Sequence, residues 1–378
     1  MKKQPGKIAN IYYLGVKELW SLWRDPVMLI LIVFTFTFSV YSSATSMPDT
    51  LNNAPIAIAD EDHSRLSQRI ASAFSPPHFT RPFMIDQAEV DLGMDSGIYT
   101  FALIIPPNFQ RDVLAGRDAQ IQLNTDATRM TQAFIGSGFI QQVISGEIDE
   151  FIKRYRDNPP PPVALELRAR FNPTLDQSWF GSLSQIINQI TMLSIILAGA
   201  ALIREREHGT VEHLLVMPVT PAEIMLAKIW SMGVVVLLAS ALSLHLVVRW
   251  ALNVPVAGSL TLFFFGAGLL LFATTSLGIF MATIARNMPQ FGMLTVLILL
   301  PLQMLSGGST PRESMPPLLQ DVMLVAPTTH FVQFGQAILF RGAGLDAVWP
   351  QLMAMALIGI ALFTFSLARF RKAIGKMA

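Results

Sequence analysis

The sequence predicts an α-helical integral membrane protein with six transmembrane helices and an α/β domain inserted after the first of them. Hydrophobic residues make up 52% of the 378 residues and charged residues only 14%, and the mean hydropathy is +0.47. A single soluble domain of this length does not have that balance. The apolar residues gather in six runs of roughly membrane-spanning length, whereas charges are spread through residues 45 to 181. This separation indicates a membrane part and a water-exposed part.

Net charge and residue types exclude several other classes of protein. The net charge is +1 and no basic patch with interleaved aromatic residues is present, which argues against a nucleic-acid partner. A chain without cysteine has no disulfide, no thiolate metal site and no cysteine nucleophile. The spacing of His208, Glu212 and His213 fits neither H-E-x-x-H nor H-x-x-E-H. We therefore expect the chain itself to bind no metal and no other cofactor.

Residues 1 to 25 predict a helix that lies in the membrane interface, because lysines and tryptophans recur with apolar residues at helical spacing. Asp25 and Pro26 then favour a new helix start. The uncharged run that follows predicts the first span, residues 26 to 44. A cleaved signal peptide is the alternative interpretation, since small residues end the run, but the run is longer than the apolar core of a usual signal peptide.

Residues 45 to 181 predict a water-exposed α/β domain. Short apolar or alternating segments in it are typical of strands and amphipathic segments of helices. The predicted strands are 54–59, 98–105 and 119–124, and the predicted helices are 62–74, 108–115 and 140–158. Pro159 to Pro162 then form a stiff linker. The acidic residues at 60–62 are explained by a turn and a helix cap rather than by a cation site.

The second predicted span, residues 183 to 203, carries three amide side chains on one face, Gln185, Asn188 and Gln189. Amides are costly against lipid, so we expect this face to meet protein or a water-filled cavity. The amides predict either a substrate pathway, to which Gln303 on the fifth span would add, or ordinary hydrogen bonds between helices.

Four further apolar runs predict the third to sixth spans, at 229–252, 260–285, 291–305 and 347–368. The fifth span is short and is interrupted by Pro301. Between the last two spans, residues 306 to 346 contain prolines that separate apolar pieces, each too short to cross a bilayer. This segment therefore predicts a re-entrant or interfacial hairpin.

A densely charged segment, residues 204 to 221, lies between the second and third spans and cannot enter hydrocarbon at a tolerable cost. It contains two helix starts. Thr210 can cap a short amphipathic helix. Thr220, Pro221 and Glu223 then supply a cap, a proline at the first helical position and a capping-box glutamate for the next span. The pattern predicts a short helix at the membrane face, shaped to dock on another molecule.

Lysine and arginine counts orient the predicted spans. Thirteen of these residues lie in four segments that share one side, 1–25, 204–228, 286–290 and 369–378. The opposite short loops hold three, and the long 45–181 stretch is not counted. Because positively charged loops stay in the cytoplasm, both termini and the 204–221 segment are predicted to be cytoplasmic. The α/β domain and the 306–346 hairpin are predicted to lie outside.

Three runs and the layout of the spans resemble a known family. The runs are PIAIADEDHSRLS at 55–67, REREHGTVEHLLVMPVTP at 204–221 and LSGGSTPRESMPPLLQDVMLVAPTTHF at 305–331. In these features, which cover nearly the whole chain, the sequence resembles the permease subunit of bacterial ABC-2 type exporters. It resembles the branch with a large extracytoplasmic domain between the first two spans. The resemblance implies a periplasmic domain at 45–181 and a permease domain at 182–378, in the bacterial inner membrane.

The resemblance also implies a function. Such a chain is the transmembrane permease subunit of an ATP-driven exporter, which moves a small or amphipathic substrate out of the cytoplasm. It is not an enzyme, because ATP and Mg²⁺ bind to a separate ATP-binding subunit; no G-x-x-x-x-G-K-[ST] motif occurs in this sequence. Further implied partners are a second permease, identical or different, a periplasmic adaptor of the membrane-fusion type, and membrane lipid.

Permeases of this family dock a charged cytoplasmic segment in a cleft of the ATP-binding subunit. The resemblance therefore implies an ATPase-coupling role for seven residues, Glu205, Glu207, Gly209, Thr210, Glu212, Leu214 and Leu215. The charged side chains would engage the ATP-binding subunit while the leucines fill a groove. The alternative interpretation is that these charges only reach from the membrane interface into water.

Two other functional classes remain open from the sequence. A membrane-anchored receptor would explain the water-exposed domain but not the five further spans. A secondary, ion-coupled transporter would explain the spans, but the sequence has no paired charges at mid-membrane and no internal repeat.

Overall fold

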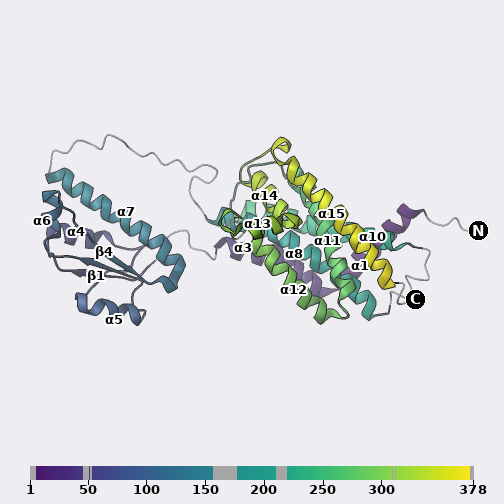
Figure 1. The fold of residues 1–378 in the computed structure, drawn as a ribbon, viewed down its shortest axis with the longest axis horizontal. Coiled ribbons are helices and arrows are strands. Elements are labelled where there is room, and N and C mark those ends of the chain that lie inside the picture. The colour runs from purple at the N-terminus through teal and green to yellow at the C-terminus, as the bar shows by residue number, and fades with distance from the viewer. Residues whose placement is uncertain are drawn as a thin grey trace, which may run out of the picture. The chain divides into compact units, whose positions relative to one another are not determined.

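The computed structural model of the protein describes residues 6–45, 51, 53–155, 177–209, 219–308, 310 and 312–374. The fold is mostly helical and contains one small sheet, as the sequence predicts (Figure 1). The chain forms two compact units. One consists of Met1–Met47 and Ala169–Ala378, and the other of Pro48–Arg168.

Within the part of the chain that the structure describes, six helical spans of the first unit are long and apolar enough to cross a membrane, which agrees with the predicted number. They are α2 with α3 (Pro26–Phe36, Phe38–Thr45), α8 (Gln177–Glu207), α10 (Pro221–Ser243) with its π-helical extension (Leu244–Ala251), α11 (Leu260–Ile284), α12 (Met288–Leu305) and α15 (Leu345–Ile374). The helix of the third span begins at Pro221, where the sequence predicts a helix start, so the span extends to an earlier residue than the apolar run predicted from 229. This earlier start places Lys228 inside the span.

Helix α1 (Lys7–Trp23) precedes the spans, where the sequence predicts an amphipathic helix. The chain then turns at Asp25, whose side chain accepts a hydrogen bond from the Met28 amide at 3.1 Å. Pro26 occupies the first position of α2, where its missing amide hydrogen costs nothing. The predicted helix start at Asp25 and Pro26 is therefore confirmed.

The proline-rich segment before α15 forms a bent pair of short helices. These are α13 (Pro317–Val322) with a 3-10 turn (Met323–Val325), and α14 (Pro327–Leu339). The two arms meet at an angle of 94°. Pro327 sets this bend, because the residue before a proline is held in extended conformation and cannot continue a helix.

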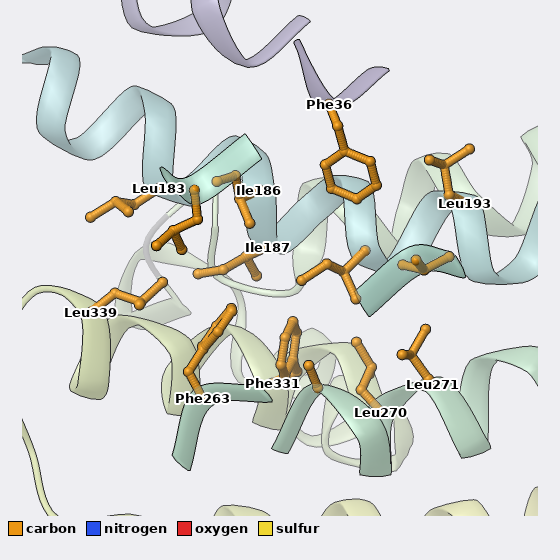
Figure 2. Close-up of a cluster of buried hydrophobic side chains, with 14 of the residues drawn as sticks. Phe36, Leu183, Ile186, Ile187, Leu193, Phe263, Leu270, Leu271, Phe331 and Leu339 are labelled. Atoms are coloured by element: carbon orange, nitrogen blue, oxygen red, sulfur yellow. The ribbon is translucent and has the colours of Figure 1, made fainter. Parts of the chain in front are cut away.

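The core of this unit lies between α8, α11 and α14 (Figure 2). Leucine and isoleucine side chains of α8 point toward aromatic and leucine side chains of the other two helices: Leu183, Ile186 and Ile187 face Phe263, Leu270, Leu271, Phe331 and Leu339. Helices α8 and α11 approach closely at Gly278, where a Cβ atom would lie 2.5 Å from the Ile195 carbonyl oxygen. Helix α8 is therefore the central helix of the unit.

The second unit is an α/β domain with a four-stranded sheet in the order β2-β1-β3-β4. The strands are β1 (Ile56–Asp60), β2 (Phe83–Met84), β3 (Phe101–Ile105) and β4 (Gln122–Thr125). Strand β1 pairs in parallel with β2 and β3, while β4 pairs with β3 in antiparallel fashion. The α/β class of this unit agrees with the sequence pattern.

Side chains of β1 and β3 alternate between two apolar layers. Ile56, Ile58, Phe101 and Leu103 pack in the larger layer, with helices α4 (Arg65–Ala73), α6 (Phe109–Ala115) and α7 (Met130–Tyr155). The small residues Ala57 and Ala102 face the other layer, which contains Val90 of α5 (Val90–Asp95). The acidic turn after β1 serves as a turn, since Asp60 accepts hydrogen bonds from the amides of residues 62 and 63 at 3.1 and 3.0 Å.

Candidate functional site

The charged segment between α8 and α10 is described at its two ends. Helix α8 runs to Glu207, and Gly209 takes a φ of +69° that turns the chain out of the helix. The predicted coupling residues Thr210, Glu212, Leu214 and Leu215 lie outside the described residues. The candidate site is therefore built from residues 204–209, the start of α10 and the elements that these contact.

The start of α10 is fixed by a capping box. The Thr220 hydroxyl oxygen accepts from the Glu223 amide at 3.3 Å, and the Glu223 carboxylate accepts from the Thr220 amide at 2.5 Å. Pro221 is the first residue of the helix. The reciprocal bonds satisfy two amides that would otherwise lack partners, and they confirm the predicted helix start.

Glu205 lies inside the protein, between two lysines. Its Oε1 is 2.8 Å from the Lys17 Nζ of α1, and its Oε2 is 2.7 Å from the Lys228 Nζ of α10. Glu205 is 8% exposed and Lys228 only 1% exposed. The sequence predicts contact of Glu205 with an ATP-binding subunit, but the structure places this carboxylate in an internal ion cluster.

Glu18 of α1 completes this ion cluster. The Lys228 Nζ lies 3.0 Å from the Glu18 Oε1, and the Lys17 Nζ lies 3.8 Å from the same oxygen. Burial raises the pKa of the Glu18 carboxyl, a rise that the Lys228 ammonium opposes and the Glu205 carboxylate reinforces. Two lysines and two glutamates from three helices thus form a neutral cluster, which we call the buried charge cluster.

Helix α1 is held against α10 beside the buried charge cluster. The Trp230 indole Nε1 donates to the Ile11 carbonyl oxygen at 3.1 Å, and its ring stacks on the Tyr12 ring with centroids 6.0 Å apart. A Cβ atom on Gly15 would overlap the Trp230 indole, so only glycine permits this close approach. Helix α1 therefore packs on α10 as a fixed part of the unit.

The last turn of α8 contacts three further helix ends. Arg204 forms an ion pair with Asp25, the cap of α2. The Arg206 Nη1 donates to the Ala285 carbonyl at the end of α11 at 2.6 Å, and the Glu207 Oε1 accepts from the Met288 amide at the start of α12 at 2.9 Å. The four residues 204–207 thus connect α8 to α1, α2, α10, α11 and α12.

The predicted substrate-pathway amides separate into two groups. The Gln185 and Gln189 Nε2 atoms both donate to the Ser39 hydroxyl of α3, at 2.8 and 2.9 Å. For these two amides, the structure therefore shows the hydrogen bonds between helices that the sequence left as one of two alternatives. Gln303 is half-buried on α12.

Asn188 lies on another side of α8, next to the segment that follows α12. A Cβ atom on Gly308 would lie 3.5 Å from the Asn188 Oδ1. Gly308 lines a cavity of 270 Å³, whose polar lining residues are Ser306, Arg312, Glu313, Gln333 and Gln336. Asn188 does not line this cavity itself, but its side chain lies next to Gly308, which does.

Sequence reasoning misses Lys17, Glu18 and Lys228 as members of the site. The sequence pattern places Lys228 in the helix that starts at Pro221, but on the cytoplasmic side of the apolar run that begins at 229, so the burial of this lysine is not expected. A lysine within an apolar helix is the signal that could identify the cluster. Its partners cannot be chosen from the sequence, because contacts between residues 188 and 210 positions apart form it.

Comparisons with known proteins agree with this layout. The family described as "ABC-2 family transporter protein" matches residues 26–368. The chain is 64% identical over 371 residues to the inner membrane transport permease YhhJ of Escherichia coli K12, covering 98% of this chain and 99% of that protein. It is 28% identical over 365 residues to the probable multidrug ABC transporter permease YbhR of the same strain, covering 95% of this chain and 97% of that protein.

Proposed function

This chain belongs to the ABC-2 family of transporter permeases, and we propose that it is the transmembrane subunit of an ATP-driven exporter. The observation that carries the proposal is the last turn of α8, where four consecutive residues connect the charged segment to five other helices. Such a turn can pass a displacement of the charged segment to most of the membrane unit. The protein is a multi-pass inner membrane permease. We call the last turn of α8, residues 204–207, together with its contacts to the other helices, the mechanical junction.

The ATP-binding subunit of the proposed exporter is a separate chain. Membership of the ABC-2 permease family implies such a subunit, and no phosphate-binding G-x-x-x-x-G-K-[ST] motif occurs in this sequence. ATP and Mg²⁺ are therefore expected to bind to the ATP-binding subunit and not to this chain. One relative is described as a probable multidrug transporter permease, which supports small or amphipathic molecules as the substrate class.

The orientation that we propose places both termini and the charged segment in the cytoplasm. Thirteen lysines and arginines on that side against three on the other support it. The α/β unit would then be periplasmic, available to an adaptor of the membrane-fusion type. The bent pair α13 and α14 would enter the membrane from the periplasmic face and return to it.

In the proposed mechanism, the segment after α8 docks on the ATP-binding subunit and moves when that subunit closes on ATP. Glu207, Gly209, Thr210, Glu212, Leu214 and Leu215 are the proposed docking residues, whereas Glu205 transmits the motion. Separating Lys228 from its carboxylates would leave a buried charge without its partner, at a cost of about 3–5 kcal/mol. We infer that α1, α8 and α10 move as one body. Separating these helices would break the buried ion pairs among them, whereas tilting them together would leave those pairs intact.

Two copies of the permease, or two different permeases, would supply twelve spans. The exposed apolar face of α12 supports such pairing, since only 17% of this span is buried within the chain. Its exposed side chains include Met293, Val296, Leu297, Leu300 and Met304. The polar cavity next to Asn188 is the proposed outer part of the substrate pathway.

Membrane vesicles that contain the permease and its ATP-binding subunit test this function. We expect ATP-dependent movement of a fluorescent amphipathic dye, lost when the catalytic glutamate of the ATP-binding subunit is changed to glutamine. Glu212→Ala should reduce transport without weakening the buried charge cluster, whereas Glu205→Ala with Glu212→Ala should abolish transport while the protein still inserts. Dye movement driven by a proton gradient without ATP would instead favour a secondary transporter.

A further inference from the structure

Four cations, from two helices and from the turn after a third, line one cavity of 360 Å³ at the end of the membrane unit. Arg206 comes from the last turn of α8, and Arg286 follows the end of α11. Arg369 and Lys372 come from the last turns of α15. We call this cavity the basic pocket. Its four cations come from three separate stretches of the sequence, at 206, 286 and 369–372, so the fold brings these stretches together.

Within the described part of the chain, carboxylates do not neutralise the basic pocket. Among the residues that the structure describes, none of the four cations forms an ion pair with an acidic side chain. The Arg206 guanidinium donates to the Ala285 carbonyl oxygen, and the other three side chains are exposed. Three helix C-termini contribute about −0.5 charge each, which offsets less than half of the four positive charges. The pocket therefore attracts an anion.

Apolar side chains continue from the basic pocket along the membrane-facing seam of α11 and α15. Ile284 lines the pocket and is 45% exposed, and Phe365, one turn before Arg369, is 61% exposed. The Phe365 ring packs on the Phe280 ring of α11 with centroids 5.0 Å apart. In a bilayer this seam meets acyl chains. A ligand with an anionic head and an apolar tail fits both parts of the surface, whereas a free anion uses only the pocket.

We propose that the basic pocket binds the phosphodiester headgroup of an anionic phospholipid, with an acyl chain along the α11–α15 seam. Arginine forks match phosphate oxygens geometrically, and basic pockets between membrane helices at a cytoplasmic face are suited to anionic headgroups. Arg206 belongs to the same turn of α8 as Glu205, so a bound lipid would join the ends of α8, α11 and α15. The lipid would thus stabilise the framework around the mechanical junction.

The experiment uses the purified full-length chain in detergent micelles, titrated with phosphatidylglycerol while thermal unfolding is followed. We expect phosphatidylglycerol to raise the melting temperature in a saturable way, and phosphatidylcholine to have a much smaller effect. Arg369→Gln with Lys372→Gln removes two pocket cations, so the apparent affinity for phosphatidylglycerol should fall roughly thirtyfold. Arg371→Gln is the matched control, because this exposed arginine of the same helix does not line the pocket.

Several results would overturn the lipid site. An equal loss of affinity in Arg371→Gln would mean diffuse surface charge, and equal stabilisation by inorganic phosphate would mean a site for free anions. Loss of the ATP-binding subunit from the double variant, with lipid affinity unchanged, would mean a protein-docking surface. If the double variant melts at a lower temperature without lipid, Lys372→Gln alone is titrated, and an affinity equal to wild type would contradict the proposal.

Discussion

Lys228 is a buried cation that two carboxylates balance, at 2.7 Å to Glu205 and 3.0 Å to Glu18. We predict that Lys228→Met lowers the free energy of unfolding by about 3–5 kcal/mol, because two carboxylates would remain buried with one partly exposed lysine. Chemical unfolding of the detergent-solubilised protein measures this loss.

The matched control for Lys228→Met is Lys17→Met. The Lys17 side chain is 48% exposed, so water screens its pair with Glu205 and the expected loss is about 1 kcal/mol or less. Lys228→Met with Glu205→Met should be more stable than Lys228→Met alone, since removing both partners leaves fewer buried charges without a partner. Equal losses in Lys228→Met and Lys17→Met would show that the cluster is hydrated and not buried.

A second important residue is Gly15, because the packing of α1 on α10 depends on it. We predict that Gly15→Ala destabilises the packing of α1 on α10, because the new methyl group overlaps the Trp230 indole. Overpacking lowers the free energy of unfolding by about 1–3 kcal/mol. Because alanine favours a helix more than glycine does, up to about 1 kcal/mol of this loss is offset. The unfolding midpoint and the protease sensitivity of α1 measure the effect. Gly268→Ala in α11 is the control, since nothing lies near its Cβ, and a cost there as large as in Gly15→Ala would contradict the proposed overlap.

How much of the site the sequence predicts depends on the range of the contacts. The cap at Asp25 and the capping box at Thr220 and Glu223 were predictable, because three or fewer residues separate the bonded groups. The buried charge cluster was not, because helix packing brings Glu18 to Lys228 across 210 positions. A carboxylate in a charged run is indistinguishable in the sequence from one that faces a partner protein, which explains the different placement of Glu205.

Helix α8 makes different contacts on different sides. The Gln185 and Gln189 amides bind Ser39, whereas Asn188 lies beside the polar cavity. We predict that Ser39→Ala lowers stability by about 1 kcal/mol, since interhelical bonds of this type contribute about 0.6 kcal/mol each on average, and that it leaves the substrate range unchanged. Asn188→Leu should instead alter dye transport at near-wild-type stability.

Transport assays and unfolding of the same two variants check this division of α8. A Gln185→Leu, Ser39→Ala double-mutant cycle gives the control, since the coupling energy isolates the interhelical bond. The division of α8 would be wrong if Ser39→Ala changed the substrate range and Asn188→Leu did not.

At the scale of the whole molecule, the six spans were predictable because a helix that crosses a bilayer must be apolar along its length. A run of apolar residues long enough to cross a bilayer is rare in water-soluble domains. The α/β class of the second unit was predictable from alternating and apolar segments, but the two-residue strand β2 and the short helix α5 gave no periodic signal. Helix α7 begins at Met130, ahead of the predicted residue 140, because glycines and polar residues obscure its first turns.

The central claim is that α1, α8 and α10 move as one body when the ATP-binding subunit closes. Because the permease has no cysteine, spin labels can be placed at chosen exposed positions. Tyr13→Cys with Val234→Cys reports the distance between α1 and α10, and Val234→Cys with Leu357→Cys reports that between α10 and α15.

Double electron–electron resonance on the complex with a cysteine-free ATP-binding subunit, nucleotide-free and trapped with ATP, is the direct measurement. We predict that the distance between residues 13 and 234 stays the same in both states, while the distance between 234 and 357 changes. A change between 13 and 234 as large as that between 234 and 357, or no change in either, would contradict the claim.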